Sequence, residues 1–271
     1  MKIKNLLLML FVYPYLISTY AKDAPQAPTP TPQPSLTQFN YKLTLIVDFK
    51  KREKILKANG EEPTVLDKAI SKLSSEFQAG EVVDIVEKKQ NQLKITSTMS
   101  PTSMVSLFIG DKKFRRESLS VLDKAGYKTY SYYEQRGDSP RSTSLVDYKK
   151  MSTSFYVGNK IDRTEKISSD VSDMLTVLYE GIRPDKKNLE FNFSSSKSLK
   201  KLQFSPAEMW DFTVAGVKYK ARRYVKRIDK ADPASFEIWI EETKKIPLRY
   251  QIGLNENYGV TMLMELESFK P

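Results

Sequence analysis

The sequence predicts a mainly β (α+β) fold, a curved antiparallel sheet of about ten strands with two amphipathic helices. Two observations lead to this prediction. Segments in which apolar and polar residues alternate recur along most of the 271 residues, whereas only two segments show helical periodicity. A sheet of this many strands has to curl. Helices with one apolar stripe are then expected to cover its open face.

The clearest predicted strand opens the folded region. Apolar and polar side chains alternate from Gln38 to Lys50, and Ile46 is the single exception among the polar positions. Because successive side chains of a strand point to opposite faces, this pattern predicts one long strand with one buried face. The apolar positions are Phe39, Tyr41, Leu43, Leu45, Val47 and Phe49.

Two further patterns predict the helices. In the first, Thr64 and Asp67 form a capping pair before an apolar stripe, and Gly80 is expected to end the helix. The second is expected to begin at Ser169 as N-cap and to end at Arg183, which precedes a proline. Acidic residues in its first turn would favour the positive end of the helix dipole.

The remaining elements are predicted strands separated by turn residues. A hairpin loop is expected at residues 255–259, because glycine and asparagine there suit a tight turn. The predicted strands are 82–87, 92–99, 105–109, 113–118, 128–134, 144–149, 153–157, 161–166, 189–193, 210–214, 219–227, 236–241, 248–254 and 260–268.

The first residues predict export. Two lysines precede an apolar run from Leu6 to Ile17, and small residues follow at a plausible cleavage site, which is the pattern of a signal peptide. The run is shorter than the roughly 20 residues of a spanning helix. We expect cleavage of this segment near Ala21, and the alternative is that it remains as an uncleaved anchor. We therefore expect a signal peptide at 1–21 and a proline-rich disordered linker at 22–36.

A single β-rich domain is expected over residues 37–271, located in the periplasm, with secretion beyond the outer membrane left open. The whole chain has 44 Lys and Arg residues against 33 Asp and Glu residues. This surplus suits anionic partners such as lipid headgroups, and peripheral membrane contact is compatible with it. A simple solvated surface is the favoured explanation of this surplus, and no nucleic-acid motif is present. We expect a monomer.

The composition argues against catalysis. The sequence contains no histidine and no cysteine, the side chains most used in nucleophilic attack and proton transfer near neutral pH. Glu241 and Glu242 are strand neighbours and would point to opposite faces. Serine–lysine pairs such as Ser168 with Lys166 lie in polar stretches that would not desolvate the lysine. We expect a non-enzyme with no catalytic residues, cofactor or metal.

Several motifs in the C-terminal half resemble the exported bacterial "domain of unknown function 3108" family. The family pattern is a helix with Asp-x-Leu-Ser-x-x-Tyr, a glycine-led strand, a tryptophan-containing strand, Pro-x-Arg and a final hairpin. This sequence has threonine where the serine is usual, and its segment 50–80 fits the pattern poorly. The matching residues are Asp173, Thr176, Tyr179, Gly216, Trp239, Pro247, Arg249 and Gly259.

The resemblance implies a LolA/LolB-like half-barrel, a strongly bent sheet closed by helices over an apolar hollow. We therefore expect a periplasmic carrier for a lipid, a lipoprotein or another acylated partner. The alternative is a cell-envelope assembly module that binds a protein or an anionic polymer through a basic face or a sheet edge. Whether the hollow is open or filled by side chains is left open. The candidate cavity-lining residues are Leu43, Leu45, Met174, Leu178, Tyr179, Trp239 and Met262.

Overall fold

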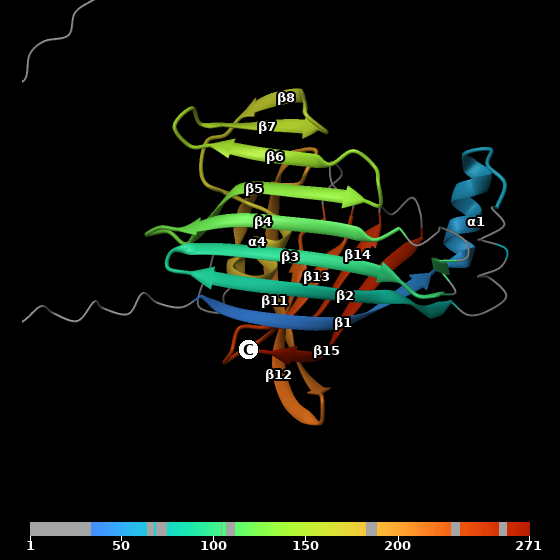
Figure 1. Ribbon diagram of the computed structural model, residues 1–271. Coiled ribbons are helices and arrows are strands. Elements are labelled where there is room, and N and C mark those ends of the chain that lie inside the picture. Colours follow the sequence, from blue (N-terminus) through green and yellow to red (C-terminus); the bar gives the residue numbers. More distant parts are fainter. Residues whose placement is uncertain are drawn as a thin grey trace, which may run out of the picture. The chain divides into compact units, whose positions relative to one another are not determined.

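The computed structural model describes residues 34–63, 68, 75–103, 105–106, 112–182, 189–228, 234–254 and 259–271. The chain divides into two units, Met1–Pro32 and Gln33–Pro271, and every described residue belongs to the second. The predicted signal peptide and most of the predicted linker lie outside the described residues. Figure 1 shows the second unit as a large curved sheet.

Fifteen described strands form this sheet, more than the ten predicted. They follow the order β8-β7-β6-β5-β4-β3-β2-β1-β15-β14-β13-β12-β11-β10-β9. The strands are β1 (Ser35–Val47), β2 (Glu76–Lys89), β3 (Gln92–Pro101), β4 (Phe114–Leu122), β5 (Tyr127–Arg136), β6 (Ser142–Asp147), β7 (Ser152–Val157), β8 (Lys160–Lys166), β9 (Val171–Ser172), β10 (Glu190–Ser194), β11 (Leu199–Val214), β12 (Val217–Lys226), β13 (Phe236–Glu241), β14 (Pro247–Leu254) and β15 (Val260–Lys270).

The pairing explains how the two ends of the domain meet. Strand β1 pairs with β2 on one side and with β15 on the other, and both pairings are antiparallel. The first and last described strands are therefore neighbours in the sheet. The pairing of β9 with β10 is parallel and covers two residue pairs. The predicted fold class, a mainly β protein with a large curved antiparallel sheet, is confirmed.

The sheet is not closed by strand pairing, because β8 and β9 are its two edges. Side chains cross the remaining space instead. The Arg163 guanidinium on β8 donates to the carbonyl of Lys197, and the Ser196 hydroxyl donates to Glu134 over 2.6 Å. The turn between β10 and β11 therefore contacts the wall formed by β5 to β8.

The predicted alternation in the first strand is confirmed up to Val47, whereas Phe49 and Lys50, which were predicted to end this strand, lie in a helix. Phe39, Tyr41, Leu43 and Val47 are all buried on one face of β1, as the period of two requires. This face is concave and holds the main hydrophobic core, in which residues from β1 pack with residues from β2, β3, β13, β14 and β15.

The first predicted helix is wrong in its C-terminal part. Residues 76–89 form strand β2, so Gly80 is a strand residue and not a helix stop. The β-branched run from Val82 to Val86 favours a strand, and pairing with both β1 and β3 extends it toward its N-terminus. Most of the segment from Thr64 to residue 74 lies outside the described residues. A helix that was not predicted, α1 (Phe49–Ala58), directly follows β1 instead.

The second predicted helix exists, but it is shorter and begins later. It comprises α4 (Met174–Thr176) and a π-helical turn, η1 (Val177–Gly181). Asp173 and not Ser169 is the N-cap, because residues 171–172 are occupied in pairing with β10. Arg183 lies outside the described residues. Among the described segments, no helix has the length and apolar character needed to cross a membrane.

Replacing Gly80 by alanine is predicted to destabilise the protein by about 1–3 kcal/mol. A Cβ atom at this position would meet the backbone carbonyl oxygen of Ser100 on β3, and a ladder residue cannot easily move away. Urea unfolding followed by circular dichroism measures the change. The exposed neighbour Glu81 supplies the control, since E81A should shift stability by less than about 0.5 kcal/mol. Equal midpoints for G80A and E81A would contradict the close approach.

Candidate functional site

The carboxylate of Asp173 is the centre of a buried hydrogen-bond network. It accepts bonds from the backbone N–H groups of Leu175 (2.8 Å) and Thr176 (3.1 Å), which caps the helix. It also accepts from the hydroxyls of Ser118 (2.5 Å), Thr129 (2.6 Å) and Thr176 (2.8 Å). Burial raises the pKa of Asp173, and these donors act against that rise. The helix start is thereby fixed to β4 and β5.

Tyr179 fixes the other end of the same helix. Its hydroxyl donates to a carboxylate oxygen of Asp84 on β2 over 2.8 Å and lies 3.2 Å from the hydroxyl of Tyr41 on β1. The Tyr41 hydroxyl donates to the Pro247 carbonyl over 3.0 Å. Burial raises the pKa values of both tyrosines and of Asp84. The motif residues Asp173, Thr176 and Tyr179 therefore attach the helix to β4 and β5 at its start and to β1 and β2 at its end.

One pocket on the concave face is almost entirely apolar apart from three cations; we call it the methionine pocket. It has a volume of about 410 Å³. Its apolar walls come from β1, β2, β3, β4, β14 and β15 and from Val105. The lining residues are Leu43, Leu45, Ala79, Met99, Pro101, Val105, Lys112, Phe114, Arg116, Arg136, Ile252, Met262 and Met264.

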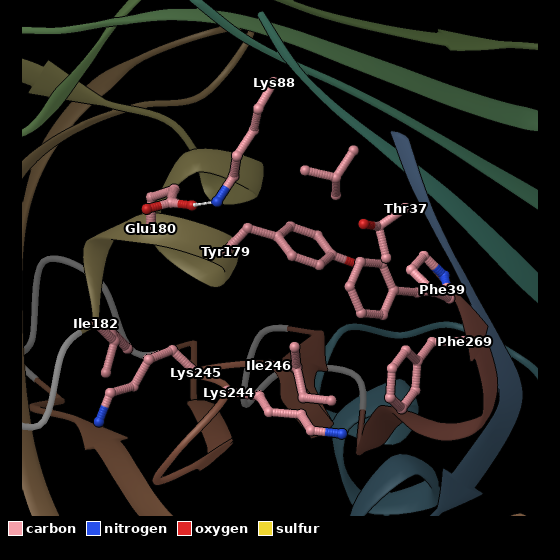
Figure 2. A pocket seen from close by; sticks show the side chains of 12 residues that line it. Thr37, Phe39, Lys88, Tyr179, Glu180, Ile182, Lys244, Lys245, Ile246 and Phe269 are labelled. Carbon is pink, nitrogen blue, oxygen red and sulfur yellow. Dashed lines mark ion pairs between the residues drawn. The ribbon is translucent and has the colours of Figure 1, made fainter. Parts of the chain in front are cut away.

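A second pocket, the aromatic pocket, is larger and more polar, with a volume of about 650 Å³. Figure 2 shows Tyr179 extending from the helix toward Phe39, and the ring centroids of these two residues are 5.1 Å apart. An ion pair between Lys88 and Glu180 lies at one side of the pocket. Further lining residues are Thr37, Val86, Ile182, Lys244, Lys245, Ile246, Phe269 and Pro271.

Tyr41 separates the two pockets along β1. Phe39 lines the aromatic pocket, whereas Leu43 and Leu45 line the methionine pocket, and all of these residues share one strand face with Tyr41. The bonds of Tyr41 to Tyr179 and to the Pro247 carbonyl hold its side chain between them. The hollow is thus partly filled by the helix and its polar contacts, and the remaining space is divided.

The structure distributes the predicted cavity-lining residues over several environments. Leu43, Leu45 and Met262 come together in the methionine pocket, and Tyr179 lines the aromatic pocket. Leu178 is buried in the core, and Met174 packs against it.

Trp239 lines neither of these pockets. It is buried beside two arginines of neighbouring strands: the guanidinium carbon of Arg249 lies 5.4 Å from its ring centroid, and that of Arg223 lies 5.9 Å away. Trp210 packs edge-to-face against it, with ring centroids 5.7 Å apart. Trp239 lies between Ile238 and Ile240 along β13, so its side chain projects from the opposite face of the strand to theirs.

The predicted cavity-lining residues do not include Met264 and Arg116, which both line the methionine pocket. Met264 follows Met262 at the spacing of two that places strand residues on one face. Arg116 belongs to a run of cations, yet it lies on the same face of β4 as Ser118 and Ser120, and all three residues are buried. The alternation in β4 was the available signal, but a charged residue is rarely expected to face inward.

Glu241 and Glu242, the two carboxylates considered for acid–base chemistry, each bind groups of the protein itself. Glu241 is buried, and its carboxylate accepts bonds from the backbone N–H groups of Thr243 (2.9 Å) and Lys244 in the following turn. The Glu242 carboxylate pairs with Arg222 at 3.3 Å. Within the described ranges, no group of three or more acidic side chains could hold a metal ion.

Comparisons with known proteins give a weak structural likeness. No family model matches the chain, and no curated protein matches its sequence, so the resemblance to the "domain of unknown function 3108" family stays a prediction. Among solved structures, the chain is similar to a domain of a candidate outer membrane lipoprotein-sorting protein from Vibrio parahaemolyticus, with 10% identity and a TM-score of 0.19. The match covers 87% of this chain and 84% of that one. A TM-score this low supports no conclusion about function.

Replacing Asp173 by alanine is predicted to cost about 3 kcal/mol or more of folding stability. The change removes a helix cap and leaves buried hydroxyl and amide donors without their acceptor. Urea unfolding of D173A measures the loss. The control is D170A, because Asp170 is exposed and its contact with Lys128 spans 4.0 Å. A D173A protein as stable as D170A would show that the network does not hold the helix.

Proposed function

We propose that this protein is a non-enzymatic binding or carrier protein that holds a lipid or acylated ligand in the methionine pocket. The observation that carries the proposal is the apolar lining of a pocket on the concave face of the sheet. Its volume of about 410 Å³ lies toward the lower end of the usual range for small-molecule sites. A single hydrocarbon chain suits such a space better than a ligand with several chains.

The energetics of the site favour a hydrocarbon ligand. Each buried methylene contributes about 0.8 kcal/mol, so a chain of ten carbons gains about 8 kcal/mol, which is of the same order as the cost of association. Three of the lining residues are methionines, namely Met99, Met262 and Met264. Their flexible, polarizable side chains adapt to chains of different shape. The pocket is therefore suited to bind hydrocarbon chains without strict selection for their length.

The proposal also includes a non-catalytic role in the cell envelope. The sequence has no histidine or cysteine, and no carboxylate belongs to the described lining of the methionine pocket, so no general base is placed there. The predicted signal peptide supports export, and the basic surface would favour contact with anionic membranes. A carrier that meets a membrane could load and release its ligand at that surface.

The proposal predicts that the purified domain binds the neutral fluorescent probe N-phenyl-1-naphthylamine, with saturable enhancement of its emission. M262E should weaken this binding at least tenfold, because the variant places a carboxylate beside the hydrocarbon in the pocket wall.

The matched control is M209E, since Met209 lies on β11 with 37% of its surface exposed and is not among the described residues lining the pocket. Circular dichroism establishes that both variants are folded. Absence of probe binding by the unmodified protein, or equal binding by M262E and M209E, would refute the proposal.

A further inference from the structure

The methionine pocket carries an unbalanced positive charge. Its described lining contains Lys112, Arg116 and Arg136 and no acidic residue. Lys112 and Arg136 are exposed at the rim, whereas Arg116 is only 5% exposed. An apolar pocket that contains only cations is complementary to a ligand that is both apolar and anionic.

Arg116 is the buried member of the three cations. One of its terminal nitrogens donates to the Ser97 hydroxyl over 3.0 Å, but its Nε atom has no hydrogen-bond partner among the described residues. Asp84 and Glu134 lie within electrostatic range, yet no ion pair joins either carboxylate to Arg116 in the described part of the chain. A buried guanidinium without a paired anion is costly, and an anionic ligand would remove that cost.

Asp84 is not free to supply that anion. One of its carboxylate oxygens accepts the Tyr179 hydroxyl, as part of the contacts that hold the helix. Its carboxylate interacts with the charge of Arg116 and with Ser97, which accepts from the guanidinium, but no ion pair joins it directly to Arg116 in the described part of the chain. Burial raises the pKa of Asp84, and the charge of Arg116 acts against that rise.

Tyr250 provides a second unused donor near Arg116. Its side chain is fully buried, and its hydroxyl lies beside the Arg116 guanidinium and donates to no acceptor among the described residues. Burial raises the pKa of Tyr250, and the nearby Arg116 guanidinium acts in the opposite direction. Tyr250 is opposite Met264 in the register, and Met264 lines the pocket. The Arg116 Nε atom and the Tyr250 hydroxyl therefore both lack an acceptor; Arg116 lines the methionine pocket, and Tyr250 is the strand neighbour of the lining residue Met264.

We propose that the ligand of the methionine pocket is a single-chain amphiphile with a carboxylate head, which accepts hydrogen bonds from Arg116 and Tyr250 while its chain packs along the methionine and leucine side chains. A guanidinium matches the planar carboxylate well. One guanidinium and one hydroxyl suit a monoanion better than a doubly charged phosphate. This inference rests on the proposed carrier function and adds the chemical class of its ligand.

Displacement of N-phenyl-1-naphthylamine by dodecanoate, dodecan-1-ol and dodecyl phosphate tests the inference, because the three ligands share one chain length and differ only in the head. We expect dodecanoate to displace the probe at a concentration at least tenfold lower than dodecan-1-ol and lower than dodecyl phosphate. Equal potency of acid and alcohol would overturn the carboxylate site while leaving the carrier function intact. A stronger effect of the phosphate would overturn the assignment to a carboxylate. Failure of the probe to bind at all would refute the carrier function itself.

Variants identify the groups that receive the head. We expect R116Q to abolish the preference for acid over alcohol and R116K to retain part of it. Y250F is expected to lower the preference several-fold and to remain folded, because the hydroxyl that it removes donates to no acceptor in the described fold.

The control R115Q changes the exposed arginine on the opposite face of the same strand, where 55% of the side chain is accessible, and should leave the preference unchanged. The rim variant K112Q/R136Q should also retain it. Loss of the preference in the rim variant, with R116Q and Y250F unaffected, would place the head at the pocket mouth and overturn the inference.

Discussion

The acceptor capacity of one buried carboxylate determines how the inside of this sheet is organised. Asp173 receives five hydrogen bonds, two from the helix backbone and three from hydroxyls, two of which belong to β4 and β5. A helix of only eight residues could not persist alone in water. The carboxylate provides the cap that starts the helix and at the same time attaches it to the wall of the sheet. The position of Tyr179, and through it that of Asp84 and Tyr41, follows from this attachment.

The fixed helix decides where a ligand can fit. A sheet of fifteen described strands that bends without closing would otherwise leave a wide hollow. The helix and its tyrosine contacts occupy the middle, so one apolar pocket remains beyond Tyr41. Asp84 accepts the Tyr179 hydroxyl and forms no direct ion pair with Arg116 in the described part of the chain, so the guanidinium can still donate to a ligand in the pocket. Structure and proposed binding chemistry are therefore consequences of the same network.

Local patterns predicted most of the strands, because alternation along a strand is read from neighbours in sequence; the predicted strand 105–109 is an exception, since residues 105–106 are helical and the rest lies outside the described residues. The burial of Phe39, Tyr41 and Leu43 was predictable in this way. Features set by distant partners were not: Gly80 lies in a strand because β1 and β3 pair with it, and Asp173 is the cap because β9 pairs with β10. The site shows the same division. Leu43 and Leu45 were selected from their strand pattern, whereas a buried arginine contradicts the usual preference of charge for solvent.

The most direct test of this account is to record methyl spectra of the protein labelled with ¹³C at its methionine methyl groups while dodecanoate is added. The nine methionines of the chain include Met99, Met262 and Met264 in the pocket and Met151 and Met209 on exposed surface. The account predicts saturable shifts of the three pocket methyl resonances and unchanged resonances for the two exposed ones. Shifts at Met151 and Met209 alone, or no saturable shift at the pocket methionines, would contradict it.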